Sequence, residues 1–165
     1  MAVKKLLSYI FDRITLPPLL ADGKNCDAAI FVTRERALVI EALLLSFARR
    51  AGFEGLSYGA AQLPRRLRWV SVEDEESLEI LAKQSSDSRF VTLNVFSGHG
   101  PLRSKSSYRL SWLDSLGMIF GRSFLIVRCG DPIRLSDSEL NTARRIARKL
   151  KLNFYQNLRL VRGTP

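Results

Sequence analysis

The stretch from Asp27 to Gly52, DAAIFVTRERALVIEALLLSFARRAG, contains the two elements that decide the fold. Its first part, Asp27–Val32, is a short apolar run that follows a turn-forming segment, which is typical of a buried strand. The part from Glu35 to Ala51 carries apolar residues at helical spacing, and the glycine after it predicts that the helix ends there. A strand followed at once by a helix is the first half of a unit whose two strands run parallel.

The same alternation extends in both directions from this stretch. Apolar residues at three- to four-residue spacing predict an amphipathic helix over residues 2–14, ended by Pro17 and Pro18. Downstream we predict strands over residues 67–72, 89–96 and 123–129, helices over residues 73–84 and 110–120 and from Ser136 onward, and a loop over residues 55–66. This order predicts an α/β fold of three layers, with a mainly parallel, twisted sheet flanked by helices. Residues 1–20 would be an amphipathic helix and linker, and residues 21–165 the α/β domain, ending in a basic amphipathic helix.

The charge of the chain points to an anionic partner. Its 165 residues include 26 Lys and Arg against 16 Asp and Glu, a formal net charge of +10. Such a balance favours a membrane surface, a nucleic acid or a phosphorylated ligand, although it could also serve solubility alone. No apolar run approaches the roughly 20 residues that span a bilayer. The first 20 residues do not show the pattern of a signal peptide.

Metal-ligating and nucleophilic residue types are scarce. The chain has two cysteines, Cys26 and Cys129, and one histidine, His99. Two scattered cysteines beside apolar segments are typical of reduced, half-buried thiols in a cytosolic protein. With a single histidine they do not make a zinc site, so we expect neither a metal nor a cofactor. The acidic run Glu73–Glu76 is expected to complement the dipole at the start of a helix.

Five segments, taken in order along the chain, carry a resemblance to a known family: residues 14–20, 30–52, 62–66, 89–101 and 121–133. They include a leucine–proline segment after a short helix, a strand with its helix, and a leucine–proline–arginine turn. A strand with a glycine-containing loop and a strand ending in Asp131-Pro132-Ile133 complete the series. In this order they resemble the N-terminal region of the bacterial membrane-associated glycerol-3-phosphate acyltransferases, which begin phospholipid synthesis.

The resemblance implies an acyltransferase-like α/β domain without catalytic residues. Acyltransferases of this superfamily use a His-x4-Asp motif, in which the histidine removes a proton from the glycerol hydroxyl. Here the residue five positions after His99 is Ser104, and a Phe-Pro-Glu-Gly-Thr-type phosphate loop is absent from the sequence. The resemblance therefore implies a non-catalytic domain that contacts the membrane surface or a catalytic acyltransferase domain or chain. It would lie peripherally on the cytoplasmic face of the inner membrane.

Two kinds of candidate binding residue follow. The loop from Ser97 to Lys105 could hold a phosphate through Gly98, Gly100, Arg103 and Lys105, or it could be an ordinary polar loop. Basic residues on the two terminal helices and beside the strand at residues 67–72 could face a membrane: Lys4, Lys5, Arg13, Arg65, Arg66, Arg68, Arg144, Arg145, Arg148, Lys149 and Lys151. The N-terminal helix either packs on the sheet or lies in the headgroup layer.

Two alternative functions stay open at this point. A divergent acyltransferase could act on glycerol 3-phosphate with His99 or another base. The chain could also be a basic nucleic-acid-binding protein. Nucleic acid is the weaker interpretation, because the aromatic residues fall in apolar elements and the sequence has no RNA-recognition signature or zinc finger.

Overall fold

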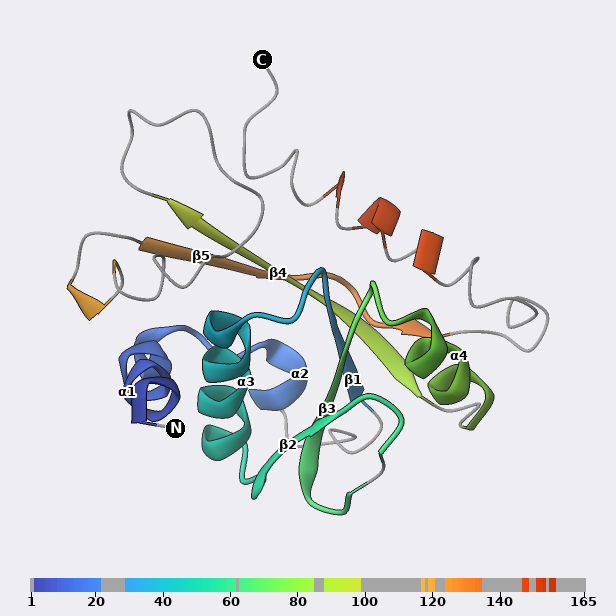
Figure 1. Ribbon diagram of the computed structural model, residues 1–165, viewed down its shortest axis with the longest axis horizontal. Helices are drawn as coiled ribbons and strands as arrows, with labels where there is room; N and C mark the ends of the chain where they lie inside the picture. The colour runs from blue at the N-terminus through green and yellow to red at the C-terminus, as the bar shows by residue number, and fades with distance from the viewer. Residues whose placement is uncertain are drawn as a thin grey trace.

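The computed structural model describes residues 2–21, 29–61, 63–84, 88–98, 117, 119–120, 124–134, 147–148, 151–153 and 155–156. It shows an α/β fold built on one mixed, mostly parallel sheet with helices on both faces (Figure 1). The predicted α/β class and the mainly parallel sheet flanked by helices are therefore confirmed.

The sheet has the strand order β2-β3-β1-β4-β5. Its strands are β1 (Ala29–Thr33), β2 (Gly55–Tyr58), β3 (Arg66–Ser71), β4 (Arg89–Gly98), β5 (Phe124–Cys129) and β6 (Ile133–Arg134). The pairs β2–β3, β3–β1 and β1–β4 are parallel, whereas β5 and β6 run antiparallel to β4. The first half of β4 pairs with β1 and its second half pairs with β5, so β4 extends the sheet into a two-stranded ribbon (Figure 1).

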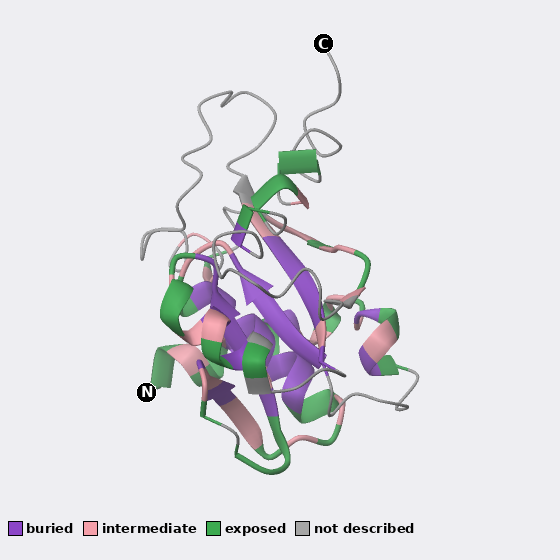
Figure 2. Ribbon diagram, turned by 90° about the vertical axis from the view of Figure 1, so that its right-hand side faces the viewer, coloured by how far each residue is buried: buried purple, intermediate pink, exposed green. Residues whose placement is uncertain are grey.

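The helices cover the two faces of the sheet with separate cores. On one face α1 (Ala2–Ile10), the 3-10 turn η1 (Phe11–Arg13), α2 (Pro18–Ala21) and α3 (Leu38–Arg50) pack on side chains such as Phe31 and Trp69. On the other face α4 (Glu75–Gln84) and Ala147 pack on Ile30, Val32, Val70 and Phe90. The described residues from 147 to 156 are helical, in agreement with the predicted final helix. Figure 2 shows the buried strands between these two layers.

The side chains of β4 alternate between the two faces of the sheet, so this strand contributes residues to both cores. Val91 and Leu93 point into the α1–α3 core, whereas Phe90 belongs to the α4 core. Thr92 and Asn94 share the face of Phe90, because successive side chains of a strand point to opposite faces. These two polar residues are buried as fully as their apolar neighbours.

Several predicted boundaries are wrong. The segment predicted as a loop over residues 55–66 contains strand β2 (Gly55–Tyr58). Helix α3 begins at Leu38 rather than Glu35, because Thr33 Oγ1 donates to the carbonyl of Glu35 at 3.0 Å and keeps that residue in a turn. The first helix ends at Ile10, where the chain tightens into η1, and Gly98 belongs to β4 rather than to the loop after it. Most of the predicted helix over residues 110–120 lies outside the described residues.

Candidate functional site

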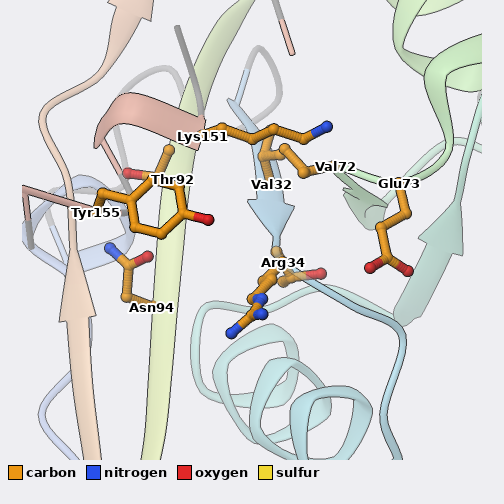
Figure 3. Close-up of a pocket in the computed structure, with 9 residues that line it drawn as sticks. Val32, Arg34, Val72, Glu73, Thr92, Asn94, Lys151 and Tyr155 are labelled. Carbon is orange, nitrogen blue, oxygen red and sulfur yellow. The ribbon is translucent and has the colours of Figure 1, made fainter. Parts of the chain in front are cut away.

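A cavity of about 260 Å³ lies where the parallel strands β1 and β3 end, beside the middle of β4 (Figure 3). Strands β1 and β4, the turns after β1 and β3, and the C-terminal helical segment contribute to it. Its lining consists of Val32, Thr33, Arg34, Val72, Glu73, Thr92, Asn94, Lys151 and Tyr155. Of these residues the sequence pattern indicated Lys151, as a cation that could face a membrane, and Glu73, as part of an acidic run at the start of a helix.

The chain connections create a crevice at this edge of the sheet. Strand β1 leads into α3 on one face, whereas its neighbour β3 leads into α4 on the other face. When the chain leaves two neighbouring parallel strands toward opposite faces, a crevice forms outside their carboxyl ends, and α/β proteins bind ligands there. The cavity occupies this crevice.

Hydrogen bonds hold the two turns at the mouth of the crevice. The Val72 amide donates to the carbonyl of Thr33 at 2.7 Å, and Ser71 Oγ donates to the carbonyl of Arg34 at 3.1 Å. Ser71 Oγ also accepts the Glu73 amide at 3.2 Å. The turn after β1 and the turn after β3 are therefore tied together, which fixes where Arg34 and Glu73 enter the rim.

Asn94 is the unusual residue of the cavity. It lies on β4, is 1% exposed, and neither Oδ1 nor Nδ2 has a hydrogen-bond partner among the described residues. Figure 3 shows its amide pointing toward the ring of Tyr155. An unpaired buried amide is costly, since buried polar side chains are almost always hydrogen-bonded. We therefore expect a ligand in the cavity to supply hydrogen-bond partners for the Asn94 amide.

Charged side chains of both signs surround the mouth. Arg34 is half-buried at the end of β1, and Lys151 is exposed on the C-terminal helical segment. The carboxylate of Glu73 lies on the side of β3. With two cations and one carboxylate, the formal charges of these three side chains sum to +1. This arrangement suits a ligand with an anionic group near the mouth and a polar group at Asn94.

A glycine allows the C-terminal helical segment to sit on the sheet. The Gly130 amide donates to the carbonyl of Thr92 at 2.8 Å, and Thr92 Oγ1 lies 3.4 Å from Asn153 Oδ1. A Cβ atom at position 130 would stand 2.2 Å from Thr92 Oγ1 and 3.0 Å from Asn153 Oδ1. Only glycine leaves room for this contact, which places Lys151 and Tyr155 over the cavity.

Comparisons with known proteins gave no match: no family model, curated protein sequence or solved structure resembles the chain closely enough to be matched.

A second candidate surface is the outer side of α1. Leu7 and Phe11 are buried against α3, so the helix packs on the sheet layer. Yet Val3, Leu6 and Ile10 are 46%, 51% and 37% exposed, and they follow one another at helical spacing. The helix thus has two apolar sides, one in the core and one facing outward. One side of α1 therefore packs in the core, as one of the two interpretations predicted, whereas the placement of the helix in a headgroup layer stays a prediction.

Acidic residues near α1 are neutralised by ion pairs. Glu41 accepts from Lys4 Nζ at 2.6 Å and from Arg36 Nε at 2.9 Å. Asp12 accepts from Ser46 Oγ at 2.6 Å and from the Arg49 guanidinium. Burial raises the pKa of each carboxyl, but these hydrogen bonds and positive charges outweigh it and leave both pKa values below the ordinary range. Lys5 and Arg13 are exposed. Because the carboxylates nearby are already paired, these two side chains give this surface its positive charge.

The predicted basic residues do not form one patch. Lys4 is held in its ion pair, and Arg65 lies 3.5 Å from the carboxylate of Glu54. Arg65 and Arg66 stand where β3 begins, whereas Lys151 stands where the parallel strands end. Arg148 and Lys151 belong to the face of the sheet opposite α1, and Arg68 is half-buried in β3. Arg144, Arg145 and Lys149 lie outside the described residues.

The remaining sequence candidates do not build a site in the described part of the chain. Gly98 ends β4 and pairs with Phe124, while His99, Gly100, Arg103 and Lys105 lie outside the described residues. Burial raises the pKa of the Cys129 thiol to about 12, so it is protonated and unreactive at neutral pH. Asp74 Oδ1 accepts the Ser77 amide at 3.0 Å, which confirms a capping role within the acidic run.

The described residues contain no group of three potential metal ligands. None of their helices is long and apolar enough to cross a bilayer.

Proposed function

We propose that the chain is a non-catalytic, acyltransferase-like domain of the glycerol-3-phosphate acyltransferase type, which attaches to anionic phospholipid through the outer side of α1. The observation that carries the membrane part is the row of exposed apolar side chains on that helix: Val3, Leu6 and Ile10. In a helix that is already anchored to the core by Leu7 and Phe11, these side chains have no packing function in the described part of the chain.

The free energy that the three exposed side chains can contribute is that of a weak, reversible membrane anchor. Full burial of a Leu or Ile side chain is worth about 1.5–3 kcal/mol. Since Leu6 is half-exposed, its remaining surface is worth about 1 kcal/mol on entering the acyl boundary, and Ile10 contributes slightly less. Such a helix would lie flat in the headgroup layer, as amphipathic surface helices do.

Charge complementarity selects anionic lipid as the partner. Lys5 and Arg13 are exposed on α1 and on the turn after it, whereas the nearby carboxylates of Asp12 and Glu41 are paired with cations. Each basic residue near an anionic surface contributes about 1 kcal/mol. The outer side of α1 therefore combines apolar contact with electrostatic attraction, and a neutral membrane would use only the first.

The acyltransferase part of the proposal depends on the resemblance of the sequence. Its support is that the resembling segments coincide with regular elements of the sheet. Residues 30–52 contain most of β1, all of α3 and the turn between them, residues 89–101 contain β4, and residues 121–133 contain β5. The non-catalytic part depends on the missing His-x4-Asp motif, because His99 is followed five residues later by Ser104.

Sedimentation with lipid vesicles tests the membrane part. We expect the chain to bind vesicles that contain phosphatidylglycerol and to bind pure phosphatidylcholine vesicles weakly. Replacing Leu6 and Ile10 together by serine should weaken binding to the anionic vesicles about thirty-fold, the equivalent of about 2 kcal/mol. Replacing Lys5 and Arg13 by alanine should weaken binding to anionic vesicles and leave the phosphatidylcholine result unchanged.

Leu63 offers the matched control, because it is similarly exposed and lies in the connection between β2 and β3. A Leu63→Ser variant should bind vesicles like the unmodified chain. Equal binding to both kinds of vesicle would contradict the proposal. So would concentration-dependent dimerisation that the serine pair abolishes, since the row would then be a contact between two copies.

Incubation with acyl-CoA and glycerol 3-phosphate tests the non-catalytic part. We expect no product. Turnover that disappears in a His99→Ala variant would show that the chain is an acyltransferase after all.

A further inference from the structure

We propose that the cavity at the carboxyl ends of β1 and β3, beside the middle of β4, binds a nucleoside monophosphate, with the base edge on Asn94 and the phosphate between Arg34 and Lys151. This inference is independent of the membrane proposal, because the cavity lies on the face of the sheet opposite α1.

The Asn94 amide specifies a planar partner. Its oxygen accepts and its NH₂ group donates, and both atoms lack a partner among the described residues. The two groups are held side by side in one plane. A ligand that satisfies both together needs an edge with a donor beside an acceptor, which is the pattern that asparagine reads on adenine.

The rest of the cavity suits a flat, partly apolar ring. Val32 and Val72 form apolar walls, and Figure 3 shows the Tyr155 ring on the side toward which the Asn94 amide points. Bases stack on aromatic side chains. Tyr155 is 58% exposed, so its side chain can turn outward to admit a ring and then lie against it.

The charges place the anionic end of the ligand. Arg34 and Lys151 line the cavity together with one carboxylate, that of Glu73. Guanidinium and ammonium groups form charge-assisted hydrogen bonds with phosphate oxygens, and these bonds are stronger than neutral ones. In Figure 3 Lys151 lies above Arg34, and Glu73 lies to one side of both, so the phosphate is expected between the two cations and away from the Glu73 carboxylate.

Isothermal titration calorimetry on the full chain separates the two halves of the proposal with three probes. They are adenosine 5′-monophosphate, ribose 5-phosphate, which lacks the base, and adenosine, which lacks the phosphate. We expect the nucleotide to bind, and each of the other two to bind about tenfold more weakly or less. Absence of nucleotide binding at millimolar concentration would overturn the proposal. Ribose 5-phosphate binding as tightly as the nucleotide would overturn the assignment of the base to Asn94.

Two variants identify the contacts. Asn94→Leu should reduce nucleotide affinity to that of ribose 5-phosphate and leave the affinity for ribose 5-phosphate unchanged. Lys151→Glu should lower the affinity for both phosphorylated probes about tenfold and leave adenosine binding unchanged. Lys151 is exposed, so this variant keeps the fold and tests the phosphate site independently of Asn94.

Lys83 supplies the control cation, because it pairs with Glu79 at the far end of α4 and does not line the cavity. Lys83→Glu should bind all three probes like the unmodified chain. Equal loss of nucleotide affinity in Lys151→Glu and Lys83→Glu would show that only the overall charge matters, and it would overturn the phosphate site.

Discussion

Replacing Asn94 by leucine should stabilise the folded chain, which is unusual for a fully buried polar residue. Asn94 is 1% exposed and both its amide atoms lack partners among the described residues. Each unsatisfied buried polar group costs about 1–3 kcal/mol. Leucine has the same branched shape, removes both polar groups and is slightly larger, and the adjoining cavity of about 260 Å³ can take up the extra volume.

The expected gain is about 2 kcal/mol in the free energy of unfolding, after part of the benefit is offset by a packing cost of about 1 kcal/mol. For a chain of this length that corresponds to a rise in melting temperature of about 6 °C. Urea unfolding followed by circular dichroism, together with thermal melts, measures both quantities. The urea m-value should stay the same, because the surface exposed on unfolding hardly changes.

Ser46 is the matched comparison, because it is equally buried but its hydroxyl donates to Asp12 Oδ1 at 2.6 Å. Ser46→Ala should destabilise the chain by about 1.5 kcal/mol, since it removes a satisfied hydrogen bond to a charged group. If Asn94→Leu destabilises the chain as much as Ser46→Ala does, the Asn94 amide has partners and the reasoning about the cavity is refuted.

Three further predictions concern the scaffold. Leu7→Ala should lower the free energy of unfolding by about 3 kcal/mol, because Leu7 is fully buried between α1 and α3, whereas Leu6→Ala should change it by less than about 0.5 kcal/mol in the same urea titration. Gly130→Ala should cost about 2 kcal/mol through the clash with Thr92 Oγ1, and a Thr92→Ala background should restore most of that loss. Asp12, Glu41 and Asp74 have folded pKa values below their ordinary values of 3.8, 4.5 and 3.8, so the stability from their contacts is complete above those values and is lost as the pH falls below them. Unfolding titrations between pH 7 and 3 should show this loss, and Asp12→Asn should make the curve shallower.

Strand β1 could be predicted because it is an almost continuous apolar run. Residues 29–33 are buried on both faces of the sheet, so apolar side chains occupy the first four positions and the strand differs clearly from the helix that follows. The start of α3 could not be placed as well. Glu35 and Arg36 read as a first helical turn, but they belong to the turn where Thr33 holds the carbonyl of Glu35 and where Arg36 covers the ring of Tyr58 at 4.7 Å.

Strand β2 escaped prediction for two physical reasons. Its four residues, Gly55–Tyr58, are bounded by glycines and include few strand-forming side chains. It also pairs parallel to β3 across a seven-residue connection, residues 59–65, where parallel neighbours ordinarily need a dozen or more. Positive φ angles of 69° at Gly59 and 55° at Arg65 make so short a return possible. No periodicity signals such a path.

One residue of the cavity could have been recognised from the sequence. In the apolar run from Phe90 to Phe96, Asn94 is the residue least suited to the middle of a strand. A polar amide in a buried strand position marks either a hydrogen-bonded network or a ligand contact. Its neighbours in the cavity, Arg34, Glu73 and Tyr155, could not be predicted. They come together only through the strand order and through the position of the C-terminal helical segment on the sheet.

The two proposed surfaces should act independently, and this follows from the way β1 is built. Phe31 packs under α3 in the core that holds Leu7, while Val32 lines the cavity on the opposite face. Among the described residues the backbones of the central strands β1 and β4 lie between the two surfaces, and β1 is paired with β3 on one side and β4 on the other. Asn94→Leu should therefore leave vesicle binding unchanged, and the serine pair at Leu6 and Ile10 should leave nucleotide binding unchanged. A nucleotide that alters vesicle affinity would mean that the sheet itself shifts between two arrangements, because coupling between two sites needs an element that both ligands bias.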